Sequence, residues 1–392
     1  MPCKDGAVFE IAGRLLTALD SGERFAVATA IDVLGSSPHG AGTSMAVGDA
    51  GSVVGSVSGG CVETAALDGC ARLLRTGLAA TARFGFGDEA AARAGLSCGG
   101  ELDVVFHPLD PGVRDELAAA AAGRSAAVAV VTAAPQDRTD LLGRTLAVGA
   151  AAGELQELPT AFDGLPDLSM NGLRAAVRGR LETGTSGAVE SACGDSMLRL
   201  FVEVAVPAAA FVVVGATEYG RALAQAATAL GYAVTVVDHR PAFAGSGRVP
   251  GGVVHGWPHE LIEGTALDRR SVVCVMSHDE ELDPLTIAAA LAGGAGYVGA
   301  LGSRSTHARR VERLVALSVP QAEIDRVHAP IGLDIGASSA AETAVSIMAE
   351  VLAARTGGSA DSLRDRTGPI HRARTVHAAG GMAPRLGERL AR

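Results

Sequence analysis

The chain has 392 residues, with 33 Lys and Arg against 43 Asp and Glu, and it is 48% hydrophobic but only 3% aromatic. This length leaves room for two or three domains with their own cores. No apolar run reaches the roughly 18 residues that span a bilayer, and the net charge of −10 creates no field that attracts nucleic acid or anionic membranes. The first ten residues lack the basic start and apolar core of a secretory signal. We therefore expect a soluble, cytoplasmic protein.

The first domain is expected over residues 1–118, as an α+β domain. Apolar spacing of three and four residues predicts a helix, and β-rich runs predict strands. In chain order we expect a helix over 7–20, a strand over 24–35, and a hairpin whose strands, 43–49 and 52–56, meet at the turn Asp49-Ala50-Gly51. A second helix is expected to begin after the glycines at 59–60. Strands over 81–86 and 101–109 follow, separated by a short helix and the loop 96–100.

The remaining chain divides into three parts. Residues 119–206 are poorly defined and are expected to join the first domain, with strands over 126–134 and 198–206 and loops over 134–142 and 162–172. Residues 207–355 alternate between strands and helices, which predicts a Rossmann-like domain with a parallel sheet. Residues 356–392 are expected to form a partly ordered tail. The predicted fold class is therefore α/β.

The cysteines are scattered, without CxxC or His-pair spacing, which excludes zinc ribbons and ferredoxin-type clusters. Two of them, Cys61 and Cys98, lie in glycine loops. Gly59 and Gly60 free the backbone before a helix, where N–H groups and the helix dipole favour an anion and lower the pKa of a thiol. Cys61 is then a nucleophile or a soft ligand; the alternative is a small, buried cysteine. The other cysteines, Cys3, Cys70, Cys193 and Cys274, are expected to be structural, free thiols.

The segment from Gly215 to Gly220 lies between a strand and a helix, and Asp238 ends the next strand. This is the context of dinucleotide binding, with Asp238 as the ribose partner. However, Thr217 stands where the second glycine would let the backbone approach a pyrophosphate. The alternative is that both glycines serve the turn and helix packing, while Asp238 caps or pairs with Arg240.

A second loop, Gly302-Ser303-Arg304, follows a strand and opens a helix, so its hydroxyl, N–H groups and guanidinium fit a phosphate. The alternative is ordinary helix capping with a solvated basic face. Further polar side chains are expected at or beyond the strand ends of the same domain, where open α/β sheets bind ligands. These are His255, Trp257, His259, His278 and Asp279.

Several motifs, in this order, resemble those of the XdhC/CoxI family, the accessory proteins of xanthine dehydrogenase and carbon monoxide dehydrogenase. They are GSVSGGCVE, LSCGG, VTVVDHRPAF, WPHE, SHDEELD, YVGALGSRSTHARR and PIGLDIGASSAAETAVSIMAE, within residues 10–355. The resemblance implies an N-terminal XdhC/CoxI domain and a C-terminal Rossmann-like domain.

The resemblance also implies a cofactor chaperone that binds molybdenum cofactor, supports its sulfuration with a cysteine desulfurase, and inserts it into an apo molybdenum hydroxylase. Cys61 would contact the metal or the transferred sulfur, without a metal site made by protein side chains alone; Cys98 would be a second thiol, and Glu63 would belong to the same catalytic group. Further residues in the first domain and in the two loops of the Rossmann-like domain would bind the cofactor. These are Ser58, Gly59, Gly60, Gly215, Gly220, Asp238, Gly302, Ser303 and Arg304. A homodimer is expected by analogy.

Two other functions stay open at this point. The first is an NAD(P)-dependent oxidoreductase that uses the Rossmann-like domain, and the second is a scaffold that only bridges partner proteins. A complete molybdenum hydroxylase is excluded, because the chain is too short and lacks the cysteine sets of two iron–sulfur clusters.

Overall fold

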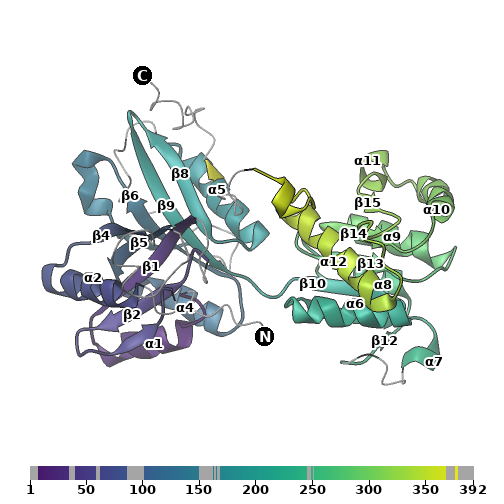
Figure 1. The fold of residues 1–392 in the computed structure, drawn as a ribbon, viewed down its shortest axis with the longest axis horizontal. Helices are drawn as coiled ribbons and strands as arrows, with labels where there is room; N and C mark the ends of the chain where they lie inside the picture. Colours follow the sequence, from purple (N-terminus) through teal and green to yellow (C-terminus); the bar gives the residue numbers. More distant parts are fainter. Residues whose placement is uncertain are drawn as a thin grey trace. The chain divides into compact units, whose positions relative to one another are not determined.

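The computed structural model describes residues 8–34, 40–58, 62–85, 101–149, 162, 165, 168–244, 249, 251–367 and 376–377. The chain forms two compact units, each described here by itself (Figure 1). The first unit holds Cys3–Pro207 together with Thr367–Arg392, and the second holds Ala208–Arg366 with the first two residues.

The first unit begins with an antiparallel sheet of five strands in the order β3-β2-β1-β5-β4. Its elements are α1 (Ala12–Ser21), β1 (Phe25–Leu34), β2 (Ser44–Gly48), β3 (Val53–Gly55), α2 (Glu63–Thr76), β4 (Ala80–Gly85) and β5 (Glu101–Pro108). The hairpin expected around Asp49-Ala50-Gly51 is confirmed as β2 and β3, and Gly51 has a φ of 91° in its turn. The short helix expected before residue 101 lies outside the described residues.

Helix α2 packs closely on this sheet because it carries a glycine at the contact. A Cβ at Gly69 would lie 2.3 Å from the ring of Phe106 on β5. The same helix face buries Ala66, Cys70 and Leu73 in one core with Phe106. The apolar spacing of the helix indicates this face with one exception, because Leu67, which the spacing also includes, is 36% exposed.

Residues 119–206 form a second sheet of the first unit, in the order β16-β8-β9-β6-β7. Its elements are α4 (Arg114–Ala121), β6 (Ala126–Ala133), β7 (Thr145–Ala147), α5 (Met170–Thr183), β8 (Gly187–Cys193), β9 (Ser196–Ala205) and β16 (Val376–His377), with 3-10 turns at Pro111–Val113 and Gln136–Leu141. The prediction of a loop over 162–172 was wrong at its C-terminal end, because α5 begins at Met170. Ser169 caps this helix by accepting a hydrogen bond from the Gly172 N–H. The short strand β16 pairs with β8 in parallel, although its sequence suggested only a tail.

Two titratable side chains lie inside the first unit. Glu203 on β9 is 4% exposed and accepts a hydrogen bond from the Phe9 N–H at 3.2 Å. His107 on β5, also 4% exposed, lies 3.3 Å from the hydroxyls of both Thr29 and Thr145 through its two ring nitrogens. Burial raises the pKa of Glu203 to about 8 and lowers the pKa of His107 to about 4. Both groups are therefore neutral in the folded protein near pH 7.

The second unit is built on a parallel sheet of six strands in the order β12-β11-β10-β13-β14-β15. Its elements are β10 (Ala210–Val214), α6 (Glu218–Ala229), β11 (Ala233–Asp238), α7 (Pro241–Ala244), β12 (Val254–His255), α8 (Pro258–Glu263), β13 (Val272–Val275), α9 (Leu282–Ala292), β14 (Tyr297–Ala300), α10 (Arg304–Ala316), α11 (Gln321–Ile324), β15 (Val327–His328) and α12 (Ala340–Thr356), followed by a 3-10 turn at Leu363–Asp365. The predicted α/β class with a Rossmann-like parallel sheet is confirmed.

Helices cover both faces of this sheet, as the unbroken valine runs predict. Successive residues of β10 enter different cores: Phe211 and Val213 pack with α6 and α12, whereas Val212 and Val214 pack with α8, α9 and α10. Figure 1 shows α6 and α12 side by side. The spacing of Ser339 and Glu342 ahead of an apolar helix predicts a capping box for α12, and the structure confirms it: Ser339 Oγ accepts from the Glu342 N–H, and the Glu342 carboxylate accepts from the Ser339 N–H.

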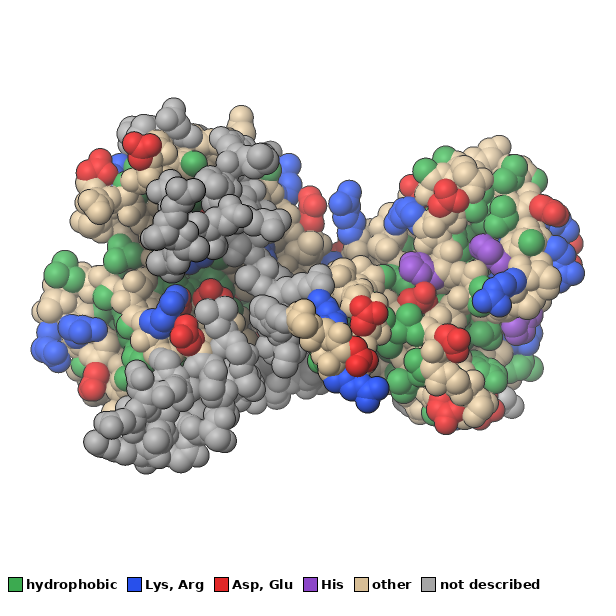
Figure 2. All heavy atoms as spheres, turned by 45° about the horizontal axis from the view of Figure 1, so that its top comes forward, with side chains coloured by type: hydrophobic (Ala, Val, Ile, Leu, Met, Phe, Trp, Pro, Cys, Tyr) green, Lys and Arg blue, Asp and Glu red, His purple; other side chains and the backbone are tan. Residues whose placement is uncertain are grey.

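The described surface carries charges of both signs. On the face drawn in Figure 2, basic and acidic side chains are interspersed, and the visible histidines lie on the second unit. In the part of the chain that the structure describes, no helix has the length and apolarity needed to cross a membrane.

Candidate functional site

The second unit has a cavity of about 280 Å³ at the point where the strand order reverses. Strand β10 lies between β11 and β13, and residues that follow all three strands line the cavity. Open α/β sheets bind their ligands at the carboxyl ends of such strands. We call this the switch cavity; it brings together two predicted site residues, Gly215 and Asp238, and the expected strand-end residues His278 and Asp279.

The turn after β10 requires both of its glycines. Gly215 has a φ of +104°, and a Cβ at Gly220 would lie 2.1 Å from the Gly215 carbonyl oxygen. Thr217 caps α6, because its hydroxyl accepts a hydrogen bond from the Gly220 N–H at 3.2 Å. This geometry agrees with the interpretation that the glycines serve the turn and the packing of the helix on the strand.

The carboxylate of Asp238 is fully engaged by protein donors. Its side chain is 1% exposed. Oδ1 accepts from the N–H and Nε of Arg240 at 3.0 and 2.9 Å, and Oδ2 accepts from the Ala216 N–H and Arg240 Nη2, both at 2.8 Å. Burial alone would raise the pKa of Asp238, but these hydrogen bonds outweigh it and hold the pKa below its usual value. Asp238 therefore holds the guanidinium of Arg240 at the cavity wall and offers no free oxygen to a ribose.

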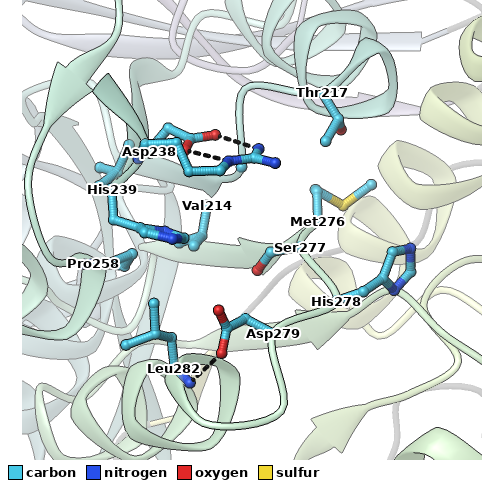
Figure 3. Close-up of a pocket in the computed structure, with 13 residues that line it drawn as sticks. Val214, Thr217, Asp238, His239, Pro258, Met276, Ser277, His278, Asp279 and Leu282 are labelled. Atoms are coloured by element: carbon cyan, nitrogen blue, oxygen red, sulfur yellow. Dashed lines mark hydrogen bonds and ion pairs between the residues drawn. The ribbon is translucent and has the colours of Figure 1, made fainter. Parts of the chain in front are cut away.

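The opposite wall is formed by residues that follow β13. Figure 3 shows Ser277 and Asp279 across the cavity from Asp238. Ser277 Oγ donates to Asp283 Oδ1 at 2.5 Å, and Arg310 Nη2 donates to Asp283 Oδ2 at 2.7 Å. Asp283 and Arg310 are 1% and 4% exposed. A buried ion pair therefore supports this wall from behind.

An aromatic pair lies at the edge of the switch cavity. The rings of His239 and Trp257 stack with their centroids 5.6 Å apart and their planes at 9°. His239 and Pro258 line the cavity, and Trp257 is 49% exposed. Trp257 is the only tryptophan of the chain, so its fluorescence reports on this edge.

The predicted loop Gly302-Ser303-Arg304 does not line the switch cavity. Ser303 caps α10 by accepting from the Thr306 N–H at 3.2 Å, and Arg304 is exposed. Gly302 has a φ of +141°, and a Cβ there would lie 3.3 Å from Arg310 Nη1. The structure thus agrees with the alternative of helix capping with a solvated basic face, except that Arg310 is buried.

In the first unit, the Glu63 carboxylate accepts three hydrogen bonds from residues that precede Cys61 in the chain. Its Oε1 accepts from Ser56 Oγ at 2.6 Å and from the Ser58 N–H at 2.9 Å, and its Oε2 accepts from Ser58 Oγ at 2.9 Å. Ser58 Oγ also accepts from the Val62 N–H at 3.1 Å. Glu63 and Ser58 therefore join residues 56–58 to residues 62–63, which lie on the two sides of Cys61 in the sequence. Gly59, Gly60 and Cys61 themselves lie outside the described residues, as does Cys98.

The described cysteines are buried, in agreement with the structural role expected for them. Burial raises the pKa of the Cys70 thiol to about 12 and also raises that of Cys274. These thiols are therefore protonated and unreactive at neutral pH. Within the described ranges, no three His, Cys, Asp or Glu side chains are grouped as a protein metal site requires.

Two family models match the chain, one in each unit. The model of the XdhC and CoxI family matches residues 18–85, and the model of the XdhC Rossmann domain matches residues 211–351. The second match contains every residue named at the switch cavity. Together the two matches cover more than half of the chain.

Similar proteins were also found by comparison of whole chains. The molybdenum cofactor insertion chaperone PaoD of Escherichia coli is 25% identical over 88% of this chain and 88% of its own. A probable xanthine dehydrogenase subunit of Bacillus subtilis is 28% identical over 41% of this chain and 47% of its own. A crystal structure described as a xanthine dehydrogenase from Bacillus halodurans matches with a TM-score of 0.57, over 91% of this chain and 98% of that chain, at 22% identity. At that identity the likeness establishes a shared fold.

Proposed function

Because the chain belongs to the XdhC/CoxI family, we propose that it binds molybdenum cofactor and inserts it into an apo molybdenum hydroxylase of the xanthine dehydrogenase type. One observation carries the proposal: the similarity to PaoD, which is named as an insertion chaperone, extends over 88% of both chains and so over both units. The protein would act by binding and handover, and the cofactor is its cargo.

The geometry of the second unit supports the binding part of this proposal. The cofactor is a pterin that carries a phosphate and a dithiolene-bound metal. The switch cavity presents the glycine turn, the N-terminal end of α6 and the guanidinium of Arg240, which together suit a phosphate. An NAD(P)-dependent oxidoreductase is supported less well, because Asp238 has no oxygen free for a ribose and Thr217 stands at the second glycine position.

The sulfuration step belongs to the proposal through the loop of the first unit. We propose that Cys61 contacts the metal or the transferred sulfur, that Glu63 holds its loop in place, and that a cysteine desulfurase supplies the sulfur. Cys98 is the candidate for a second thiol. A homodimer stays an expectation, to be checked by sedimentation equilibrium.

The proposal is tested by co-expressing the protein with the enzymes of molybdenum cofactor synthesis and measuring molybdenum and pterin in the purified product. Wild type, Cys61→Ser and Cys98→Ser are compared, with circular dichroism as the control for folding. We expect molybdenum and pterin at near-equal amounts in the wild type and a clear loss in Cys61→Ser. The same preparations are then added to the apo-hydroxylase, whose activation should follow the cofactor content.

Two outcomes would contradict the proposal at different points. Wild-type protein that contains no molybdenum or pterin, and does not activate the apo-hydroxylase, refutes the chaperone function. Unchanged cofactor content and unchanged activation in Cys61→Ser remove Cys61 from the mechanism but leave the carrier function in place. A loss confined to Cys98→Ser would assign the sulfur to the second thiol.

A further inference from the structure

Ser277 is a hydrogen-bond acceptor toward the switch cavity, because its hydroxyl hydrogen is already used. Ser277 Oγ donates to Asp283 Oδ1 at 2.5 Å. Asp283 is in turn paired with the buried Arg310, so its carboxylate has no hydrogen of its own to offer. A serine hydroxyl carries one hydrogen and two lone pairs. Ser277 lines the cavity, and it therefore presents a lone pair of its oxygen to a ligand.

Asp279 adds a second acceptor to the same wall. Its Oδ1 accepts from the N–H groups of Glu281 and Leu282 at 3.0 and 2.9 Å, whereas Oδ2 accepts from no residue that the structure describes. Figure 3 shows this second oxygen turned away from Leu282 and toward the middle of the cavity, and the ring of His278 turned to the other side. An ionised carboxylate can only accept. The wall that follows β13 thus presents two oxygens that both require a donor.

The opposite wall offers donors but little positive charge. Asp238 accepts from Nε and Nη2 of Arg240 and compensates its charge, although a guanidinium has further N–H groups. Among the Asp, Glu, Lys and Arg side chains of the lining there are one cation, Arg240, and two anions, Asp238 and Asp279. The N-terminal end of α6 adds a partial positive charge on the side of Arg240. This side therefore suits one phosphate, while the carboxylate of Asp279 repels a second one.

From this division we infer that the switch cavity selects a single phosphate ester that carries hydroxyl or N–H donors beyond the phosphate, and that it disfavours a diphosphate. The phosphate lies on the side of Arg240, and the donors bond to Ser277 Oγ and Asp279 Oδ2. A dinucleotide extends its pyrophosphate across this point of an open α/β sheet, and here the second phosphate would meet Asp279. The inference rests on the proposed function, since the cargo named there is a pterin with one phosphate.

The test compares three small ligands by isothermal titration calorimetry on the full chain. Methyl phosphate has one phosphate and no donor beyond it, ribose 5-phosphate adds hydroxyl groups, and inorganic pyrophosphate adds a second phosphate. The wild type is expected to bind ribose 5-phosphate at least about tenfold more tightly than methyl phosphate, the size of one hydrogen bond to a charged group. Pyrophosphate is expected to bind no more tightly than methyl phosphate, despite its higher charge.

Asp279→Asn is expected to reverse this selection. The oxygen of Asn can still accept from the N–H groups of Glu281 and Leu282, and its amide group then offers donors in place of Oδ2. Pyrophosphate should bind about tenfold more tightly and ribose 5-phosphate about tenfold more weakly. A variant that gains binding has kept its fold. Asp325→Asn, which removes the same charge outside the cavity lining, is the matched control and should change neither affinity.

Ser277→Ala tests the other oxygen without a change of charge. It should lower the preference for ribose 5-phosphate over methyl phosphate about threefold to tenfold, whereas Ser277→Thr keeps the hydroxyl and should keep the preference. Tighter binding of pyrophosphate than of methyl phosphate by the wild type overturns the inference. It is also overturned if ribose 5-phosphate binds no better than methyl phosphate, if none of the three ligands binds, or if the selection is unchanged in either Asp279→Asn or Ser277→Ala.

These outcomes are separate from those of the proposed function. The titrations use no molybdenum cofactor, so they give a result even if the purified protein contains neither molybdenum nor pterin. A protein that carries the cofactor but prefers pyrophosphate would keep the chaperone function and lose this assignment of the switch cavity. A protein that shows the selection but neither carries the cofactor nor activates the apo-hydroxylase would keep the selection and refute the proposed function.

Discussion

Replacing Glu203 by Gln should change how the stability of the first unit depends on pH. In the folded protein the carboxyl group is buried, and its pKa is raised from 4.5 to about 8. The unfolded chain ionises this group near pH 4.5, so unfolding releases a proton at any pH between these two values. The stability associated with Glu203 is therefore complete below about pH 4.5 and is lost as the pH rises through 8. Gln cannot ionise, but its oxygen still accepts from the Phe9 N–H.

The effect is clearest above pH 6.5, because His107 counteracts it below. The pKa of His107 is lowered from 6.5 to about 4, so its contribution is complete above pH 6.5 and is lost as the pH falls to 4. Between about pH 4.5 and 6.5 the two slopes have opposite signs and nearly cancel. From pH 6.5 to 8 Glu203 dominates, and its contribution to the free energy of unfolding of the wild type should fall by roughly 1.5 kcal/mol, because the folded carboxyl group is itself half ionised at pH 8.

The assay is urea unfolding at pH 6.5, 7.25 and 8, followed by far-ultraviolet circular dichroism and by tryptophan fluorescence. Trp257 lies in the second unit, so its transition serves as an internal control. Circular dichroism also reports the first unit. Glu203→Gln should remove this fall of roughly 1.5 kcal/mol in the dichroism transition and leave the Trp257 transition unchanged. An equal pH dependence in wild type and variant would show that Glu203 is already ionised in the folded protein.

Three further substitutions test the second unit through the Trp257 transition. Gly220→Ala brings a Cβ to 2.1 Å from a backbone oxygen and should cost about 1–3 kcal/mol; an unchanged urea midpoint would contradict the close packing of α6. Ser339→Ala removes the side-chain cap of α12 and should cost about 1 kcal/mol, whereas Ser339→Asp should restore most of it. Asp283→Asn leaves Arg310 without its buried counter-charge and should cost about 3–5 kcal/mol. A loss below about 1 kcal/mol, as for an exposed pair, would show that water reaches this guanidinium.

The sequence was sufficient for the second unit because its pattern is local and strong. Short, valine-rich apolar runs, separated by amphipathic helices, predict a parallel sheet with helices on both faces. The cap of Ser339 was visible in the spacing to Glu342, and the turn at Gly215 was visible in its place after a strand. These features depend on neighbours within a few residues.

The site depended on contacts that the spacing of residues does not encode. Arg310 and Asp283 are 27 positions apart, and Arg310 stands in a helix whose other arginines are exposed, so its burial had no local sign. Of the four hydrogen bonds that occupy Asp238, three come from Arg240 two residues away, the pairing that the sequence offered as an alternative, whereas the fourth comes from the Ala216 N–H, 22 positions away, and had no local sign. Residues 119–206 were unclear because the strands of their sheet are separated by a long stretch with weak periodicity.

The pairing of β16 with β8 means that the chain leaves the first unit after Pro207 and returns to it from Thr367. The second unit is therefore an insertion held by two connections, and a single proteolytic cut between the units would not separate them. A fragment that ends at residue 207 would lack β16 and leave Val189 and Glu190 of β8 without their backbone partners. Uncovered strand edges pair with other chains, so such a fragment should associate with other chains more readily than the full protein does.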